Sequence, residues 1–440
     1  MELRLAGARV VVVGMARSGV AALELLRQKG AMVRAVDEKP MGNILGVTIE
    51  AQNDAAFRDA ELVVISPGVP TDLGLLQQVR ARGVPVIGEL ELAAQFLQGQ
   101  TIGITGTNGK TTTTALTGHI LRESGIACQV GGNIGTPPAA MVATSRPDQW
   151  NVLELSSFQL ETIQDFRCAI AACLNVTQNH LDRHHTFENY MAAKARVFET
   201  QRKGDLAVLN SDDPVTVGFA KRTPAETAWF SGTHPVAGAW IDGDVIRLRG
   251  AELLNVQDLR LRGRHNYENV MAAALIAERA GAKPLQIARA AATFAPVEHR
   301  LELVREVDGV AYYNDSKATS VDATLKAIDA FSGGLWIILG GKDKGSDYTA
   351  LREPLRAKAR AALLIGAAAP KIAAHLGEGA VPVIQCGTLP AAVEKAHRSA
   401  QPGDTVLLAP ACSSFDQFES YEHRGRVFKE LVNALAEGNA

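Results

Sequence analysis

Apolar and helical patterns alternate along the whole chain. Short runs of Val, Ile and Leu are separated by longer stretches rich in Ala, Leu, Glu and Arg, whose apolar residues recur with helical spacing. This alternation is typical of parallel sheets with helices on both faces, so we predict an α/β fold. The predicted strands lie at residues 8–13, 32–36, 62–65, 84–87, 101–104, 152–155, 169–174, 206–209, 310–313, 335–339, 361–365 and 405–408.

The chain is too long for one hydrophobic core. It has 440 residues, whereas single cores stop growing at roughly 250–300 residues. The series of strands pauses near residues 91–100, and a Gly- and charge-rich stretch at 232–264 is predicted to be a small β meander. We therefore predict three domains, at residues 1–93, 94–299 and 300–440.

Composition narrows the classes of partner. The net charge of -2 at pH 7 gives no basic footprint for nucleic acid or for an anionic membrane surface. The five cysteines contain no C-x-x-C pair, so neither a zinc site nor a disulfide framework is indicated. The apolar run near the first residue is too short for a signal peptide or a membrane span. We expect a cytoplasmic monomer that binds small molecules.

The most informative motif is T-G-T-N-G-K-T-T at residues 105–112, between a predicted strand and a helical stretch. This is the layout of a phosphate-binding loop, in which successive backbone N–H groups and a helix N terminus bind an anion. Lys110 would neutralise phosphate charge and the Thr111 hydroxyl would hold Mg²⁺. The common pattern has glycine where this chain has Ile104. An ATP-consuming protein is the favoured interpretation, and a surface turn that carries a lysine is the alternative.

A second turn of nucleotide-binding type follows the first predicted strand. Gly14 and Gly19 bracket this turn, and Asp37 ends the next strand. Ala16 replaces the middle glycine of the dinucleotide motif, which argues against the close approach of a dinucleotide pyrophosphate. Another turn, at residues 66–68, ends a strand at the same sheet edge. We predict a site for a different nucleotide, and a Rossmann-like scaffold without a ligand is the alternative.

Three titratable residues follow or accompany strands of the second block. Glu154 lies near the carboxyl end of a predicted strand, where a carboxylate reaches Mg²⁺ in phosphoryl-transfer enzymes. His180 follows another strand, at the same sheet edge. Lys194 stands in an apolar helical run, a costly position unless the amine is paired or modified. A surface histidine and a snorkelling lysine are the alternatives.

Motifs along essentially the whole chain resemble those of the Mur ligases, the ATP-dependent amide-forming enzymes of peptidoglycan precursor synthesis. The motifs lie at residues 105–112, 131–135, 153–160, 175–184, 190–196, 264–269, 298–302, 313–319, 339–345 and 410–418. The resemblance implies a Rossmann-like N-terminal domain, a P-loop-type ATPase central domain and a Rossmann-like C-terminal domain. One departure is Asn179, where the family often has Asp.

The resemblance also implies substrates and metal ligands. The C-terminal motifs look most like those of the member that adds D-glutamate, so the implied substrates are ATP, UDP-N-acetylmuramoyl-L-alanine and D-glutamate. Thr111 and Glu154 would hold one Mg²⁺. His180 and a carbamylated Lys194 would hold a second Mg²⁺.

The remaining implied site residues fall into groups by ligand. Those for ATP are Gly106, Thr107, Asn108, Gly109, Lys110, Thr111, Thr112, Asn266, Asn269, Arg300 and Asp315. Those for the UDP portion are Arg17, Ser18, Asp37, Glu38, Lys39, Ser66, Pro67 and Gly68, with Asn133 and His180 at the muramoyl-alanine end. Those for the incoming amino acid are Lys317, Thr319, Lys344, Ser414 and Tyr421. Lys110, His180, Lys194, Arg300 and Lys317 are the expected catalytic residues.

Two other functions remain open. Folylpolyglutamate synthase or another Mur ligase shares the ATPase core and differs in the first and last domains. An NAD-dependent dehydrogenase or a nucleotide-regulated binding protein could use the turn at Gly14, but these functions leave Glu154, His180 and Lys194 unexplained.

Overall fold

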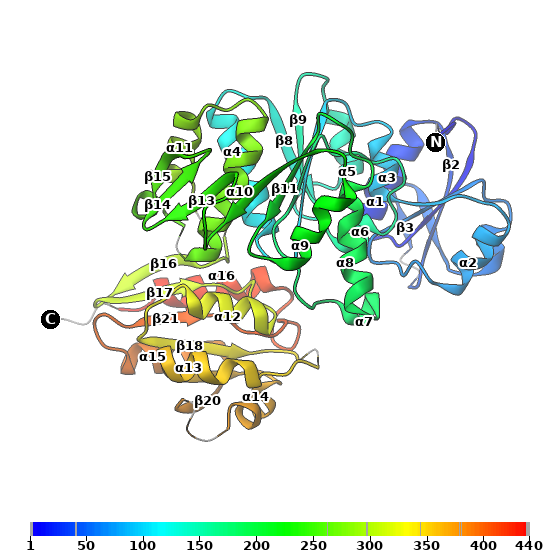
Figure 1. The fold of residues 1–440 in the computed structure, drawn as a ribbon. Coiled ribbons are helices and arrows are strands. Elements are labelled where there is room, and N and C mark those ends of the chain that lie inside the picture. The colour runs from blue at the N-terminus through cyan, green and yellow to red at the C-terminus, as the bar shows by residue number, and fades with distance from the viewer. Residues whose placement is uncertain are drawn as a thin grey trace. The chain divides into compact units, whose positions relative to one another are not determined.

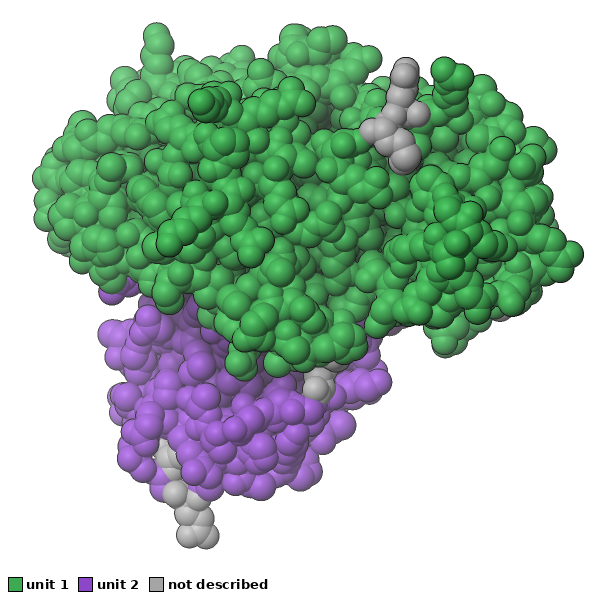
Figure 2. Space-filling view, turned by 45° about the vertical axis from the view of Figure 1, so that its right-hand side comes forward, with its two compact units in different colours: residues 1–259, 267–294 green, residues 260–266, 295–440 purple. Residues whose placement is uncertain are grey.

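The computed structural model describes residues 3–39, 42–261, 263–295, 298–343, 345–377, 379 and 381–436. The chain divides into two compact units, of which one contains residues 1–259 and 267–294 and the other residues 260–266 and 295–440 (Figure 2). Within the described residues, the strands form sheets of six, nine and six strands. The α/β fold class is confirmed, because helices pack on these largely parallel sheets (Figure 1).

The N-terminal sheet has the order β3-β4-β2-β1-β5-β6. Its strands are β1 (Arg9–Val13), β2 (Met32–Asp37), β3 (Asn43–Ile44), β4 (Val47–Ala51), β5 (Leu62–Ile65) and β6 (Val86–Gly88). All pairs are parallel except the β3–β4 hairpin. Alternate valines of β1 face opposite sides, where α1 (Arg17–Gln28) and α3 (Glu89–Ala94) cover one face, and η1 (Asp54–Phe57) and α2 (Gly74–Ala81) cover the other.

The order of these strands places two of the turns predicted to bind a nucleotide together. The chain runs from central β1 outward to β2 and then returns to the other side of β1 as β5. Open sheets bind ligands where the strand order reverses in this way, beyond the carboxyl ends of the strands. The turns after β1 and β5 therefore lie beside each other.

The central sheet has the order β15-β14-β13-β12-β11-β10-β7-β9-β8. Its strands are β7 (Gln100–Thr105), β8 (Cys128–Gly132), β9 (Trp150–Glu154), β10 (Ile170–Cys173), β11 (Leu206–Asn210), β12 (Glu226–Ser231), β13 (Gly238–Asp242), β14 (Val245–Leu248) and β15 (Ala251–Asn255). Strands β13 to β15 pair antiparallel, so the meander predicted at 232–264 is present and extends this sheet.

Helices cover both faces of the central sheet (Figure 1). Those after the strands are α4 (Lys110–Glu123), α5 (Pro138–Met141), α6 (Ser157–Leu160), α7 (Leu181–His184), α8 (Phe187–Ala195), α9 (Pro214–Phe219), α10 (Arg264–Arg279) and α11 (Pro284–Thr293). Short 3-10 helices follow at η2 (Val142–Thr144), η3 (Arg196–Phe198), η4 (Ala220–Arg222) and η5 (Val256–Asp258). The order β10-β7-β9-β8 again reverses at β7, which marks the carboxyl end of β7 as a ligand position.

The third sheet has the order β16-β17-β21-β18-β19-β20. Its strands are β16 (Glu302–Val307), β17 (Val310–Asn314), β18 (Leu335–Gly340), β19 (Ala359–Ile365), β20 (Val383–Gly387) and β21 (Thr405–Leu408). One face packs against α12 (Val321–Asp329), η6 (Thr349–Leu351), α13 (Arg352–Lys358) and α14 (Ala369–Leu376), and the other against α15 (Leu389–Ser399) and α16 (Tyr421–Asn433). Ser320, Thr388 and Ser420 cap the N termini of α12, α15 and α16.

The buried side chains of Glu89 and Glu91 bind α3 to the central part of the same unit. Glu91 accepts hydrogen bonds from the backbone N–H groups of Gln164, Asp165 and Phe166, at 2.7 to 3.1 Å. Glu89 Oε1 accepts one from Ala139 N at 2.6 Å, and its Oε2 has no hydrogen-bond partner among the described residues. Helix α3 therefore packs on the N-terminal sheet and also binds segments of the central part. Among the described residues, no helix is long and apolar enough to cross a membrane.

Candidate active site

The phosphate-binding motif forms the predicted strand, turn and helix. β7 ends at Thr105, and α4 begins at Lys110. Gly109 adopts φ +83°, and a Cβ there would lie 2.3 Å from Asn269 Oδ1, so a larger residue would strain the turn. Lys110 Nζ donates to the carbonyls of Gly106 and Thr107, at 2.9 and 2.8 Å. The ammonium group therefore lies over the loop that carries it.

Two backbone donors of this loop bind another part of the protein. Thr107 N donates to Asn175 O at 2.8 Å, and Asn108 N donates to Asn175 Oδ1 at 2.9 Å. In this structure these two N–H groups therefore donate to Asn175, whereas the sequence predicts that successive N–H groups of the loop converge on an anion. We expect the anion at the start of α4, where the helix N terminus attracts negative charge.

Asn175 is a site residue that sequence reasoning did not single out. It follows β10, which pairs with β7, and its Nδ2 returns a hydrogen bond to Asn108 O at 3.2 Å. Thr107 Oγ1 also lies 3.1 Å from the hydroxyl of Tyr190. The sequence places Asn175 at the end of a neighbouring strand and at the start of the motif at residues 175–184, but neither feature indicates its contact with the phosphate loop.

Glu154 contacts two of the other predicted residues. It ends β9 and is 2 % exposed. Thr111 Oγ1 donates to its Oε2 at 2.7 Å, and Asn133 Nδ2 donates to its Oε1 at 2.8 Å. The structure thus brings together Thr111, Asn133 and Glu154 from the phosphate loop, the segment after β8 and the end of β9.

Lys194 projects from α8 into the interior beneath the same loop. It is 1 % exposed, and its Nζ donates to Gly106 O at 2.7 Å and lies 4.6 Å from the centre of the Tyr190 ring. Burial, reinforced by the positive charge of Lys110, lowers the pKa of Lys194 well below its usual value. The ammonium form is therefore disfavoured, and the snorkelling lysine is excluded because the amine does not reach solvent.

His180 stands at the N terminus of α7 with left-handed backbone angles of φ 54° and ψ 36°. Its ring packs edge-on against Phe158, with centroids 4.9 Å apart, and lies 6.4 Å from the ring of Tyr190. Tyr190 thus has Lys194 and His180 as neighbours. His184, for which the sequence indicated no role, is buried beside the same rings.

Some of the residues predicted for the UDP portion hold neighbouring turns together, and others are accessible to solvent. Ser66 Oγ donates to Gly14 O at 2.6 Å, and a Cβ on Gly19 would lie 1.9 Å from the same carbonyl oxygen, which explains glycine there. Asp37 accepts from Met15 N at 2.7 Å and from Lys39 N at 3.0 Å. These contacts join the turns after β1, β2 and β5.

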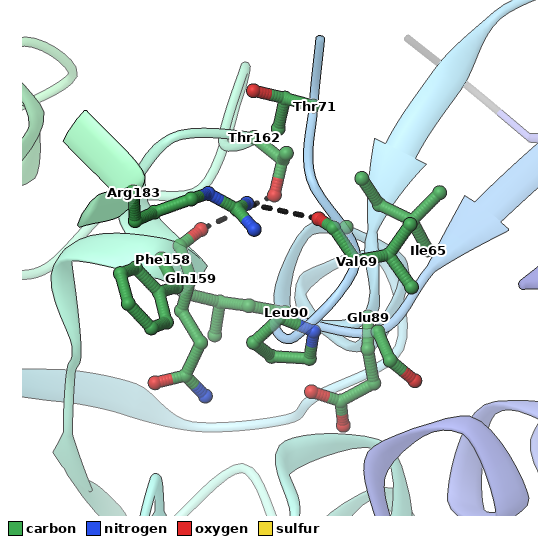
Figure 3. A pocket seen from close by; sticks show the side chains of 12 residues that line it. Ile65, Val69, Thr71, Glu89, Leu90, Phe158, Gln159, Thr162 and Arg183 are labelled. Carbon is green, nitrogen blue, oxygen red and sulfur yellow. Dashed lines mark hydrogen bonds between the residues drawn. The ribbon is translucent and has the colours of Figure 1, made fainter. Parts of the chain in front are cut away.

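The other members of this set are more accessible. Arg17, Glu38, Lys39 and Gly68 are exposed, and Ser18 and Pro67 are half-buried. Arg17 donates to Gly135 O in the segment after β8, so this turn also contacts the central part of the first unit. Ser66 and Pro67 line a small pocket together with Phe158 and Arg183 (Figure 3).

Predicted residues of the second unit gather around the loop after β17. Asp315 is buried, which raises its pKa to about 6, although the positive charges of Arg300 and Lys317 act in the opposite direction. Lys317 Nζ lies 5.5 Å from the centre of the Tyr421 ring. Thr319 N donates to Lys317 O at 2.8 Å. Arg300, Asp315, Lys317 and Tyr421 are therefore neighbours.

Four more of the predicted residues belong to the amino-acid and ATP sets. Ser414 is buried, and its carbonyl accepts from Phe418 N at 2.9 Å. Lys344 lies outside the described residues. Asn266 belongs to the second unit, whereas Asn269, one turn later on α10, belongs to the first and accepts from Thr113 Oγ1 at 3.2 Å.

The donor atoms of the site suit Mg²⁺ to different degrees. A threonine hydroxyl and a carboxylate, as in Thr111 and Glu154, are the hard oxygen donors that Mg²⁺ prefers. The neutral amine of Lys194 is not such a donor, and becomes one only if it carries a carboxylate.

A cluster of potential metal ligands also occurs in the second unit. Glu298, His299 and Glu302 bring ligand atoms within 4.8 Å of one another. Lys429 Nζ donates to both carboxylates, at 2.9 and 2.6 Å, so an ammonium group already balances this charge.

Family models match three successive parts of the chain. Residues 8–88 match the Mur ligase MurD-like N-terminal domain, residues 104–277 the Mur ligase middle domain, and residues 299–412 the Mur ligase glutamate ligase domain.

Curated relatives match over nearly their full length. The chain is 61 % identical to the UDP-N-acetylmuramoylalanine--D-glutamate ligase of Solibacter usitatus, over 98 % of this chain and 99 % of that protein. It is 51 % identical to the protein of the same name from Koribacter versatilis, over 99 % of each.

Solved structures of lower identity share the fold. UDP-N-acetylmuramate-alanine ligase MurC from Thermotoga maritima matches with a TM-score of 0.62 at 18 % identity, covering 97 % of this chain and 99 % of that chain. MurF ligase from the same organism, in complex with ADP, matches with a TM-score of 0.62 at 16 % identity, covering 99 % and 100 %.

Proposed function

The chain belongs to the Mur ligase family, and from this premise we propose that it is an ATP-dependent ligase that adds D-glutamate to UDP-N-acetylmuramoyl-L-alanine. The observation that carries the proposal is the 61 % identity to a D-glutamate ligase over 98 % of this chain and 99 % of the relative. The match of residues 8–88 to the MurD-like N-terminal domain favours this member over folylpolyglutamate synthase and other Mur ligases. A dehydrogenase is disfavoured because it has no use for the phosphate loop beside Glu154.

The proposed reaction forms an amide in two steps. The carboxylate of UDP-N-acetylmuramoyl-L-alanine attacks the γ-phosphorus of ATP, and ADP leaves, which gives an acyl phosphate. The amine of D-glutamate then attacks the acyl carbon and loses a proton, and phosphate leaves with the electron pair of the broken C–O bond. Such phosphoryl transfer depends on positioning and charge neutralisation more than on covalent chemistry of the protein. Lys110 and Arg300 supply the positive charge in this proposal.

Magnesium fits the first donor pair. Thr111 and Glu154 would hold one Mg²⁺, and the ion would neutralise phosphate charge during transfer. We place a second Mg²⁺ at His180 and Lys194, provided that the lysine is carbamylated. The support is burial of the amine and its lowered pKa, because the neutral amine is the form that attacks CO₂ to give a carbamate and a proton.

The remaining assignments follow the same proposal. The domains are residues 1–93, 94–299 and 300–440, for the UDP-substrate, ATP and amino acid respectively. The UDP portion is assigned to the turns after β1, β2 and β5, and ATP to residues 106–112 with Asn266, Asn269, Arg300 and Asp315. The amino acid is assigned to Lys317, Thr319, Lys344, Ser414 and Tyr421, since its two carboxylates require cationic and hydroxyl donors. We place the enzyme in the cytoplasm as a monomer.

Phosphate release from ATP tests the function directly. The protein is incubated with ATP, Mg²⁺ and UDP-N-acetylmuramoyl-L-alanine, and D-glutamate, L-glutamate, L-alanine and L-lysine are compared. We expect release with D-glutamate only. Equal release with all four amino acids, or release with none, would contradict the proposal.

A further inference from the structure

The loop after β5 is tied to the central part of the first unit by one arginine. Arg183 is the third residue of α7 and lines the small pocket beside Ser66, Pro67 and Val69 (Figure 3). Its Nη2 donates to Val69 O at 2.8 Å, and its Nη1 lies 3.5 Å from Gly68 O. Arg183 therefore binds the backbone of the turn to which part of the UDP portion is assigned.

The same guanidinium nitrogen also donates to a carboxylate. Arg183 Nη2 donates to Glu161 Oε2 at 2.8 Å, with only 12 % of the arginine side chain and 14 % of the glutamate side chain exposed. The ring of Phe158 lies 5.0 Å from the guanidinium carbon and covers one of its faces. A pair so shielded from solvent is ordered and weakly screened by salt.

The contacts continue from Glu161 toward the metal-binding carboxylate. Glu161 Oε1 lies 3.1 Å from His184 Nδ1, and His184 Nε2 lies 3.0 Å from Ser157 Oγ. Ser157 begins α6, three residues after Glu154. Phe158 also packs on the ring of His180, so one side chain contacts both His180 and Arg183.

We propose that Arg183 is a positioning residue that holds the loop at residues 66–69 in register with the edge carrying Glu154 and His180, and thereby sets the affinity for the UDP-substrate. This inference rests on the proposed function. The substrate has a nucleotide end at the loop after β5 and a carboxylate end at the central sheet. Its ends are presented correctly only if the loop and the central sheet keep a fixed separation.

Arginine suits this role for a geometric reason. Its planar guanidinium presents several N–H groups in a rigid fork, so it can donate to two backbone carbonyls and one carboxylate at once. A lysine has one flexible ammonium group and cannot span the three acceptors in the same geometry. Arg183→Lys therefore keeps the positive charge but cannot bind both backbone carbonyls and the Glu161 carboxylate in this geometry.

The first test measures steady-state kinetics of phosphate release for Arg183→Lys, Arg183→Ala and Glu161→Gln. We expect the KM for UDP-N-acetylmuramoyl-L-alanine to rise on the order of ten- to a hundredfold in Arg183→Ala, because small misplacements of a bound group have large kinetic effects. The rise should be smaller in Arg183→Lys, and the KM for ATP and for D-glutamate should stay within about twofold of the wild type. An unchanged KM for the UDP-substrate in Arg183→Ala would overturn the inference.

Arg167→Ala is the matched control. Arg167 pairs with the buried carboxylate of Asp205, at the amino end of β10 and thus at the opposite edge of the central sheet. Its loss removes another arginine–carboxylate ion pair of the same unit without touching residues 66–69. We expect a lower melting temperature but an unchanged KM for the UDP-substrate. An equal rise of this KM in Arg167→Ala would show that loss of stability alone explains the effect.

Hydrogen exchange of the unliganded protein separates this inference from the proposed function. Val69 N donates to Ser66 O at 3.0 Å inside the loop, so its amide reports directly on loop order. We expect faster exchange at the amides of Ser66, Gly68 and Val69 in Arg183→Ala and Glu161→Gln, but not in Arg167→Ala. Unchanged exchange would overturn the role of Arg183 even if the wild type is an active ligase. A wild type that releases no phosphate would remove the proposed function and leave the loop measurement valid.

Discussion

Lys194 is a basic residue placed where the protein interior disfavours charge. Its amine is 1 % exposed, donates to the Gly106 carbonyl at 2.7 Å, and has a pKa lowered by burial and by Lys110. The apolar run around it already marked the position as costly in the sequence. The sequence could not supply the partner, because Gly106 is 88 residues away along the chain.

Replacement of this lysine tests the proposed carbamate. Lys194→Ala should lower D-glutamate-dependent phosphate release by about tenfold to a hundredfold or more, a range typical for lost support of a metal site. Short carboxylates such as acetate or propionate should restore part of the activity, because they supply the missing oxygen ligand. Lys203→Ala, which replaces an exposed lysine in the same unit, serves as the control. Full activity of Lys194→Ala without added carboxylate would contradict the role.

Glu89 is a buried acid whose raised pKa should make the stability of the protein depend on pH. Burial raises its pKa from 4.5 to about 8. At pH below 4.5 the folded and unfolded chains both hold the proton, so Glu89 makes no pH-dependent contribution. Between 4.5 and about 8 only the unfolded chain loses it, so the free energy of unfolding falls as pH rises. The slope is about 1.4 kcal/mol per pH unit from this group.

Glu89→Gln removes that titration and keeps an acceptor for Ala139 N. The variant should melt at a higher temperature than the wild type at neutral pH, and the difference should shrink toward pH 4.5. Thermal melts of both proteins across this pH range measure the effect. A difference in melting temperature that does not change with pH would show that Glu89 is ionised in the folded protein.

Strands made of continuous apolar runs are predicted from the sequence, whereas some strands with glycines or charged residues are missed. β1, β5 and β21 are short runs of Val, Ile and Leu, buried in parallel sheets, and they appear close to the predicted ranges. β8 was missed because it contains Gly131 and Gly132, and a Cβ on Gly132 would lie only 2.3 Å from the carbonyl oxygen of Glu154. β16 was missed because charged residues interrupt its apolar pattern on the edge of the third sheet.

The sequence predicts the phosphate loop but not the segment that supports it. Its glycines and lysine identify it from the sequence alone, but its support by the segment after β10 requires the pairing of β7 with β10. Asn175 and Arg183 both act through such contacts between distant segments. Short motifs thus predict the groups that carry the chemistry, while the residues that hold them in place become visible only in the fold.

Asn175→Ala tests the support of the phosphate loop. The change removes the hydrogen bonds that join the Asn175 side chain to Asn108 N and Asn108 O. We expect the KM for ATP to rise by about thirtyfold, because two lost hydrogen bonds of about 1 kcal/mol each total about 2 kcal/mol. The KM for D-glutamate should stay unchanged. The control is Asn255→Ala, at the end of β15, where the side chain accepts a local hydrogen bond from Gln257 N. Equal KM values for ATP in wild type and Asn175→Ala would contradict the role.

At the scale of the whole molecule, three sheets carry three sets of candidate ligand residues. The first unit contains the turns assigned to the UDP portion and the phosphate loop with Glu154 and Lys194, and the second contains Arg300, Asp315 and Ser414. The fold class follows from the sequence because the alternation of strands and helices extends through the entire chain. The choice of substrate does not follow from that alternation, since one fold supports many reactions. It rests on the motifs and on the full-length relatives.

In the proposed reaction the phosphate loop presents the γ-phosphate to a carboxylate and not to water. Oxygen tracing tests this step directly. The carboxylate oxygens of UDP-N-acetylmuramoyl-L-alanine are labelled with heavy oxygen, and the label is followed by mass spectrometry. With ATP, Mg²⁺ and D-glutamate, we predict one labelled oxygen in each phosphate released and an amide product that contains D-glutamate. Release of unlabelled phosphate would show that water is the acceptor and would contradict the account.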